Sequence, residues 1–242
     1  MKQTQAFLST YTADVSGVCS ALFELGGMTV MHDASGCNST YNTHDEPRWY
    51  DMDSLVYISG LSELEAVMGD DEKLISDVSD AARQLHPRFI ALAGTPIPMI
   101  TGCDLPAIAR EVEGRTNIPS FAVPSNGIGT YVAGAGQALR LYAERFITSR
   151  PEKRKNAVNI LGATPLDFSV NGCVQSMARR LEEAGFTLQS VFAMSSSIDA
   201  IDKAGAAEAN LVISSVGLPA AKYLQAQFGT PYVIGAPFGD FF

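Results

Sequence analysis

The chain has 242 residues, of which 46% are hydrophobic and 18% are charged, a composition typical of a globular protein with a sizeable core. Its 17 basic and 26 acidic residues give a net charge of −9, which argues against binding to the phosphate backbone of nucleic acid. No apolar run is long enough to span a membrane, and the first residues lack a signal-peptide pattern. We therefore expect a cytoplasmic protein that contacts neither nucleic acid nor membrane.

Predicted helices and strands alternate along residues 1–149. Apolar residues recur at three-and-four spacing over 71–85, which is typical of an amphipathic helix. Residues 28–31 and 88–93 are short apolar runs, typical of buried strands. The other elements predicted in this half are helices over 15–25, 105–112 and 130–147 and a strand over 118–123.

Residues 150–156 interrupt this alternation with a proline and several charges, so we interpret them as a linker between two domains. The second half repeats the rhythm, with predicted strands over 157–161, 188–193, 211–213 and 232–234 and helices over 172–184, 197–204 and 218–227. Strands separated by helices form parallel sheets with right-handed crossovers. The predicted fold class is therefore α/β, with two Rossmann-like domains (1–149 and 157–242) whose parallel sheets are flanked by helices.

Residues 31–49 combine the residue types that functional sites use. The segment holds His32, His44, Cys37 and the only tryptophan of the chain, with acidic residues between them. It follows the predicted strand 28–31, and open α/β sheets bind ligands outside the carboxyl ends of their strands. Gly36 lets the backbone approach a ligand closely, because glycine has no side chain. We predict a functional site here, with Cys37 as its first candidate.

The polar residues of this segment admit two interpretations. His32 and His44, together with Asp33, Asp45 and Glu46, supply the imidazole and carboxylate groups of a metal site. The same carboxylates can instead orient the imidazoles by hydrogen bonds, without a metal. With Arg48, these residues are our candidates for donating protons or binding a substrate.

The four cysteines, Cys19, Cys37, Cys103 and Cys173, are scattered without any C-x-x-C pair. Structural disulfides are not expected in a reducing cytoplasm, and a metal centre has to gather ligands from distant parts of the chain. Cys103 lies at the amino end of a predicted helix, where the dipole favours the thiolate, but a cysteine without a role fits equally well. We expect Cys19 to pack in the core, and we interpret Cys173 as structural.

Other standard motifs are missing or incomplete. The chain has no Walker A motif and no nucleophile elbow. Gly134 and Gly136 match part of a dinucleotide-binding fingerprint, but Leu139 replaces its third glycine and the motif lies within a helical pattern. We interpret these glycines as a surface for close packing of helices.

Seven blocks of the sequence carry a resemblance to a known family. They are residues 17–22, 32–37, 59–74 and 95–104 in the first half and 158–162, 181–186 and 228–231 in the second. In order and spacing they resemble the nitrogenase component 1 superfamily, which contains nitrogenase subunits, cofactor-assembly scaffolds and tetrapyrrole reductases. In that family, three cysteines of each first domain hold an iron–sulfur cluster at the interface between two related subunits.

The resemblance implies that Cys37 is the central cluster ligand of this chain. The family's other two cysteine positions fall on Ala13 and Thr95, so Cys19 and Cys103 are displaced from them by six and eight residues. Two subunits that each offer Cys37 and one further cysteine would still supply four thiolates, as a 4Fe–4S cluster requires. The sequence is equally compatible with a protein that has lost the cluster.

The leading interpretation is a subunit of a nitrogenase-like oxidoreductase. The resemblance implies that it relays electrons through an iron–sulfur cluster to an unknown substrate, in a homodimer or heterodimer served by an ATP-dependent reductase. A nitrogenase-type iron–molybdenum cofactor is not expected, because residues 213–215 carry no cysteine at the position that the family's catalytic subunit uses. The alternatives are a non-catalytic protein that binds a small molecule or metal, and a scaffold that carries a metallocofactor.

Overall fold

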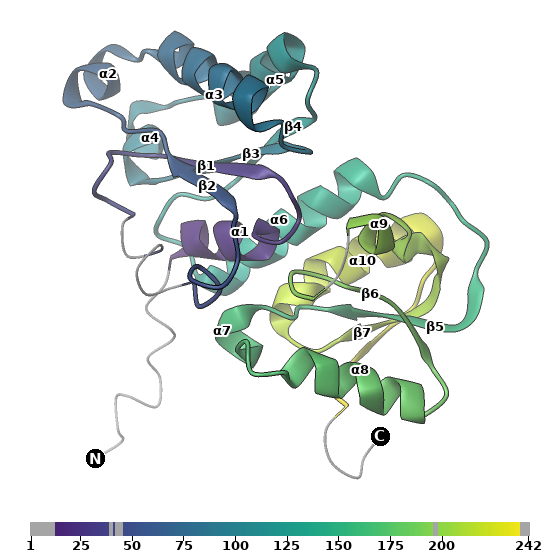
Figure 1. The fold of residues 1–242 in the computed structure, drawn as a ribbon. Helices are drawn as coiled ribbons and strands as arrows, with labels where there is room; N and C mark the ends of the chain where they lie inside the picture. The colour runs from purple at the N-terminus through teal and green to yellow at the C-terminus, as the bar shows by residue number, and fades with distance from the viewer. Residues whose placement is uncertain (1–12, 39–40, 42–45, 196–197, 238–242) are drawn as a thin grey trace, which may run out of the picture.

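The structure is a computed structural model that describes residues 13–38, 41, 46–195 and 198–237. Within these residues the chain forms two parallel sheets of four strands each, flanked by helices (Figure 1). The predicted α/β class with two Rossmann-like layers is therefore confirmed. No helix in the described ranges is long and apolar enough to cross a membrane.

The first sheet has the strand order β2-β1-β3-β4. Its strands are β1 (Met28–His32), β2 (Leu55–Ile58), β3 (Ile90–Gly94) and β4 (Ser120–Val123). β1 and β3 are buried along their whole length, because they are the central strands and helices cover both of their faces. Successive residues of these strands therefore pack against different helices.

Two pairs of helices cover the two faces of this sheet. α3 (Asp71–Leu85) and α5 (Leu105–Thr116) pack on one face, where they meet Val30 and Leu92. α1 (Asp14–Leu22) and α6 (Tyr131–Phe146) pack on the other face, where they meet Met31 and Ala93. Two short helices, α2 (Glu63–Met68) and α4 (Pro96–Thr101), follow β2 and β3.

The second sheet has the order β6-β5-β7-β8. Its strands are β5 (Arg154–Leu161), β6 (Thr187–Val191), β7 (Ala207–Val212) and β8 (Tyr232–Ile234). α8 (Cys173–Glu183) packs on one face against Ile160 and Leu211. α10 (Leu218–Phe228) packs on the other face, in the same apolar core that holds α1 and α6. Shorter helical segments are α7 (Pro165–Phe168), α9 (Ile198–Asp202), Ala204–Ala206 and Ser215–Gly217.

Helix α6 joins the two sheets, because it packs against α1 of the first half and α10 of the second (Figure 1). A Cβ atom at Gly134 would lie 1.9 Å from the carbonyl oxygen of Asp14, so only glycine permits this contact between α6 and α1. A Cβ atom at Gly136 would lie 3.1 Å from the ring of Pro219 in α10. The structure confirms that these two glycines serve helix packing.

Several elements differ from the sequence prediction. The sequence pattern does not predict β2, α2, α4 or α7. α2 buries none of its residues, and α4 begins with a proline, so neither shows a buried apolar stripe. β5 begins at Arg154, so the last three residues of the predicted linker are strand residues. The division into separate domains over 1–149 and 157–242 stays a prediction.

Candidate functional site

The carboxyl ends of β1, β2 and β3 meet at one edge of the first sheet, where the predicted site segment begins. His32 ends β1 and is 7% exposed. Its Nδ1 lies 2.8 Å from the Oγ of Ser59, which follows β2. Its backbone carbonyl accepts a hydrogen bond of 2.7 Å from the hydroxyl of Thr95, which follows β3. Residues from three adjacent strands therefore fix the position of His32.

The surroundings of His32 favour the neutral imidazole. Burial lowers the pKa of His32 below its ordinary value of 6.5, and Lys73 acts in the same direction. The carboxylates of Asp71, Asp33 and Glu65 act in the opposite direction, but burial is the largest effect. A neutral imidazole carries a proton on one ring nitrogen and accepts a hydrogen bond at the other.

Asp33 shapes the loop that carries Cys37. Its carboxylate accepts hydrogen bonds from the backbone N–H of Ala34, at 2.8 Å, and from the side-chain amide of Asn38, at 2.7 Å. Asp33 is 3% exposed, whereas Cys37 is exposed. Apart from the chain neighbours, no heavy atom of the described residues would lie within 4 Å of a Cβ atom at Gly36. The Asp33 carboxylate therefore holds the loop that exposes Cys37.

Two predicted site residues, His44 and Asp45, lie outside the described residues. The metal site that they would form with His32 and Asp33 stays a prediction. Of the side chains that the structure describes, no three His, Cys, Asp or Glu lie close enough together to hold a metal ion.

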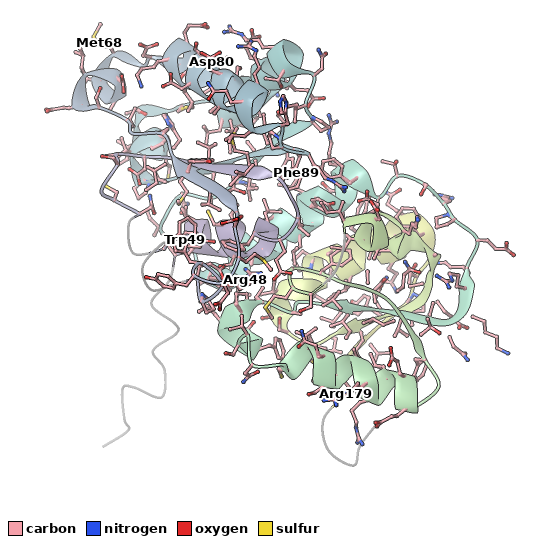
Figure 2. The ribbon with its side chains drawn as sticks, viewed as in Figure 1. Arg48, Trp49, Met68, Asp80, Phe89 and Arg179 are labelled. Atoms are coloured by element: carbon pink, nitrogen blue, oxygen red, sulfur yellow. The ribbon has the colours of Figure 1, made fainter. Side chains whose placement is uncertain are left out.

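Arg48 lies where the two halves of the chain meet and is 3% exposed (Figure 2). Its guanidinium donates two hydrogen bonds to Glu46, at 2.7 and 2.8 Å, and one of 2.9 Å to Glu24. It also donates to the backbone carbonyls of Ser20, at 2.8 Å, and Ala193, at 3.1 Å. All N–H groups of the guanidinium are thus engaged, so Arg48 links α1 to the second half. Its predicted role in substrate binding stays a prediction.

The cysteines predicted as ligands lie in three different environments. Cys19 is completely buried on the α1 and α6 face of the sheet, where burial and the charge of Glu46 raise its pKa. Cys103 packs against the core on the opposite face, and its thiol lies 3.7 Å from Asp71 Oδ1. Burial, more than this carboxylate, raises the pKa of Cys103 to about 12. Both side chains are therefore thiols at neutral pH, and Cys37 is the one that is exposed.

An iron–sulfur cluster, which the family resemblance implies, usually takes four cysteine thiolates. Cys37 fits this role, because its side chain is exposed. The two other cysteine positions of the family hold Ala13, which has no ligand atom, and Thr95, whose hydroxyl donates to the His32 carbonyl. The described part of the chain therefore fits one ligand of a cluster, and a complete set requires ligands from elsewhere.

A cavity of about 450 Å³ lies at the same edge of the sheet, and the sequence pattern does not predict it. Its walls are α2, the first turn of α3 and the residues that follow α4, and His32 and Cys103 both line it. The sequence offers these two residues as candidates but gives no sign that they share a cavity. The parallel pairing of β1 with β3 brings them to one edge, and the carboxylates of Glu65, Asp70 and Asp71 complete the polar lining.

Comparisons with known proteins match nearly the whole chain. A family model described as nitrogenase component 1 type oxidoreductase matches residues 15–240. The nitrogenase iron-molybdenum cofactor biosynthesis protein NifE of Methanosarcina barkeri is 28% identical over 196 residues, which cover 76% of this chain and 42% of the relative. One component of the light-independent protochlorophyllide reductase of Prosthecochloris aestuarii is 36% identical over 187 residues, which cover 74% of this chain and 35% of the relative.

A similar fold occurs in a solved structure titled nitrogenase Cp1 at pH 5. The two structures superpose with a TM-score of 0.77 at 19% sequence identity, over 97% of this chain and 49% of the nitrogenase chain. At this identity the superposition shows a shared fold. The chain thus spans about half the length, or less, of the relatives that it matches.

Proposed function

Because this chain belongs to the nitrogenase component 1 type oxidoreductase family, we propose that it is a subunit of a nitrogenase-like oxidoreductase that transfers electrons at a subunit interface. In this proposal Cys37 binds an iron–sulfur cluster that is shared with a second subunit. The cluster, when bound, supplies one-electron transfer.

The exposure of Cys37 carries this proposal. A cluster shared between subunits needs a sulfur atom that reaches the surface, and Cys37 is the exposed cysteine of the chain. It lies just past the carboxyl end of β1, in the loop that Asp33 holds through Ala34 and Asn38. Cys19 does not meet this need because it is buried in α1, and Cys103 is only partly exposed, because it packs against the core and lines the cavity beside His32.

A second subunit is needed because this chain fits one ligand of a cluster that requires four. Several relatives carry names of parts of larger assemblies, such as a subunit of protochlorophyllide reductase and the alpha and beta chains of the nitrogenase molybdenum-iron protein. We propose a heterodimer with a related chain that supplies the other three ligands, or a homodimer whose two Cys37 thiolates are completed by two ligands other than these cysteines. A separate ATP-dependent reductase is the proposed electron source, as the family resemblance implies.

The polar residues near Cys37 have distinct proposed tasks. Asp33 holds the Cys37 loop in place through its two hydrogen bonds. His32, as a neutral imidazole fixed by Ser59, is placed to accept or hold a proton at its second ring nitrogen. Arg48 fixes the end of the segment to the second half through Ala193.

Anaerobic purification and reconstitution with iron and sulfide test the proposal. We expect a coloured protein with about two iron atoms per chain if two chains share a 4Fe–4S cluster, and a dimer by light scattering. Cys37→Ala should lose the iron, whereas the matched control Cys173→Ala, in α8 of the second half, should keep it. A colourless, iron-free protein would overturn the proposal, and retention of iron by Cys37→Ala would overturn the ligand assignment.

A scaffold that carries a metallocofactor during assembly is the second candidate function. It is favoured by the similarity to NifE, whose name describes a protein of iron–molybdenum cofactor biosynthesis, and by the single fitting thiol, since few ligands allow a cluster to be released. Incubation of the loaded protein with a cluster-free acceptor protein separates the two functions. A scaffold transfers its iron to the acceptor, whereas an electron-transfer subunit keeps its iron through repeated reduction and oxidation.

A further inference from the structure

The cavity beside His32 is bounded by the carboxyl edge of the first sheet and by α2, α3 and α4. It has a volume of about 450 Å³, and Cys37 is not among its lining residues. One wall, formed by Leu61 and by residues 66–68 of α2, is largely apolar, and Met68 stands at the outer end of the first half (Figure 2). The rest of the lining includes Asp70, Asp71 and Cys103. This cavity is therefore amphipathic and separate from the proposed cluster ligand.

The polar side chains of this cavity offer acceptors and almost no donors. Asp70 and Asp71 each place one oxygen in a hydrogen bond, from the Lys73 N–H and the Cys103 thiol respectively, and within the described chain their second oxygens have no partner. The two hydroxyl or thiol donors are already used: Cys103 donates to Asp71, and Thr101 donates to backbone carbonyls of its own helix. A ligand that fills the cavity therefore has to supply the donors.

His32 adds a further acceptor. The Ser59 oxygen accepts a hydrogen bond from the Asp33 N–H at 3.1 Å and has its own proton directed to the Asp33 carbonyl at 3.3 Å. The 2.8 Å contact between Ser59 Oγ and His32 Nδ1 is then satisfied when Nδ1 carries the imidazole proton. This tautomer leaves a lone pair on Nε2, which has no partner in the described part of the chain. His32 is more than nine-tenths buried and lines the cavity.

The charge of the cavity is negative. Glu65, Asp70 and Asp71 line it, and no lysine or arginine does. Lys73 lines a narrow adjoining space and pairs with Glu65 at 3.5 Å and with Asp77 at 3.0 Å. A metal ion does not fit, because no three potential ligands of the described chain are close enough together. An organic cation with N–H donors satisfies both the charge and the unpaired acceptors.

We propose that this cavity binds a small organic ammonium ion, with the ammonium at His32 and Asp71 and a short apolar body against Leu61 and α2. The site goes beyond the proposed electron transfer and does not depend on it. The carboxylates provide charge-assisted hydrogen bonds, and the apolar wall favours an alkyl or aryl ammonium over ammonium itself. An anion of the same shape meets three carboxylates and is excluded.

Isothermal titration of the full-length chain with butylammonium, benzylammonium and putrescine tests the proposal, with butyrate and butanol as anionic and neutral controls. We expect at least one amine to bind with a Kd of about 1 mM or tighter and butyrate not to bind. Asp71→Asn should weaken amine binding about tenfold, because it removes a charged acceptor. Glu72→Gln is the matched control: it removes the same charge from the same helical turn, but Glu72 pairs with Arg115 and does not line the cavity.

Three results would overturn the proposal. The first is that none of the amines binds, and the second is that butyrate binds as tightly as butylammonium. The third is an equal loss in Asp71→Asn and Glu72→Gln, which would mean that the amines respond to overall charge and not to a site. The iron content of Asp71→Asn should equal that of the unmodified protein, so failure of this site and failure of the cluster proposal are distinguishable.

Discussion

Replacing Arg48 by alanine should destabilise the protein more than any surface charge change. Arg48 makes five hydrogen bonds, to Ser20 of α1, to Glu24 just after α1, to Glu46, which accepts two, and to Ala193 of the second half. Its removal leaves the Glu46 carboxylate, which is 3% exposed, without a counterion, and it leaves two backbone carbonyls without their donors. The substitution therefore leaves the buried Glu46 carboxylate unpaired, and it also breaks a contact between the two halves.

The expected cost follows from the charges in this network. One arginine faces two carboxylates, Glu46 and Glu24, so the network carries one net negative charge, and Arg48→Ala raises this to two. Breaking a buried ion pair by removing one partner costs roughly 3–5 kcal/mol of unfolding free energy. The double variant Arg48→Met with Glu46→Gln should recover much of this loss, because it removes the stranded charge as well. Glu24 is less critical, since its side chain is 13% exposed.

Urea denaturation monitored by circular dichroism and by the single tryptophan, Trp49, measures the loss. The matched control is Arg88→Ala, which removes an arginine that pairs with Asp199 of α9 across the two halves. Both partners of that pair are more than half exposed, so the control should cost less than about 1 kcal/mol. If Arg48→Ala costs no more than Arg88→Ala, or if the double variant is the least stable, the reasoning is wrong.

Three further predictions concern the neighbouring features. Because burial lowers the pKa of His32, the imidazole is protonated at a higher pH in the unfolded chain than in the folded one, so the unfolding free energy should fall as the pH drops below 6.5. Urea titrations across that pH should show a smaller fall in His32→Asn. An equal fall in the variant would contradict the role of His32. Iodoacetamide should label Cys37 readily and Cys103 roughly a thousandfold more slowly than an ordinary cysteine, because raising the pKa of Cys103 from 9.0 to about 12 removes most of its thiolate. Peptide mass spectrometry measures both labelling rates, and similar rates would refute the raised pKa of Cys103. Gly134→Ala should lower the unfolding free energy by roughly 1–3 kcal/mol or more, because it overpacks α6 against α1. Gly114→Ala, whose Cβ atom meets nothing within 4 Å, should instead stabilise α5 by about 0.5–1 kcal/mol. Thermal unfolding distinguishes the two variants, and equal losses of stability would exclude the packing explanation.

The sequence predicts most of the fold because most elements bury a regular apolar pattern. α3 matches the predicted range 71–85, since its apolar residues recur at helical spacing and Asp70 caps its start. β2 escapes prediction because it is an edge strand of four residues, with Tyr57 exposed, and such a short run has no distinctive period. α2 escapes because none of its residues is buried.

The candidate site is less predictable, because its contacts join residues that are distant in sequence. The position of Cys37 just past β1 follows from the pattern of residues 28–37 alone. The partner of Arg48 in the second half is Ala193, whose contribution is a backbone carbonyl, and no sequence pattern marks it. Likewise, the cavity depends on the packing of α2 and α4 beside His32. The apolar residues Leu64, Val67 and Met68 of α2 are exposed and α4 buries only Pro98, so no buried apolar stripe places these helices.

The position of α6 determines how the protein unfolds. Leu139 and Tyr142 of α6 lie in one apolar cluster with Leu22 of α1 and Leu224 of α10, so residues of both halves form a single shared core. Heating should therefore melt both sheets in a single cooperative transition, since neither can lose its helices without exposing the other. A fragment that ends at residue 149 would expose to solvent the apolar side of α6 that packs against α10, and it would aggregate.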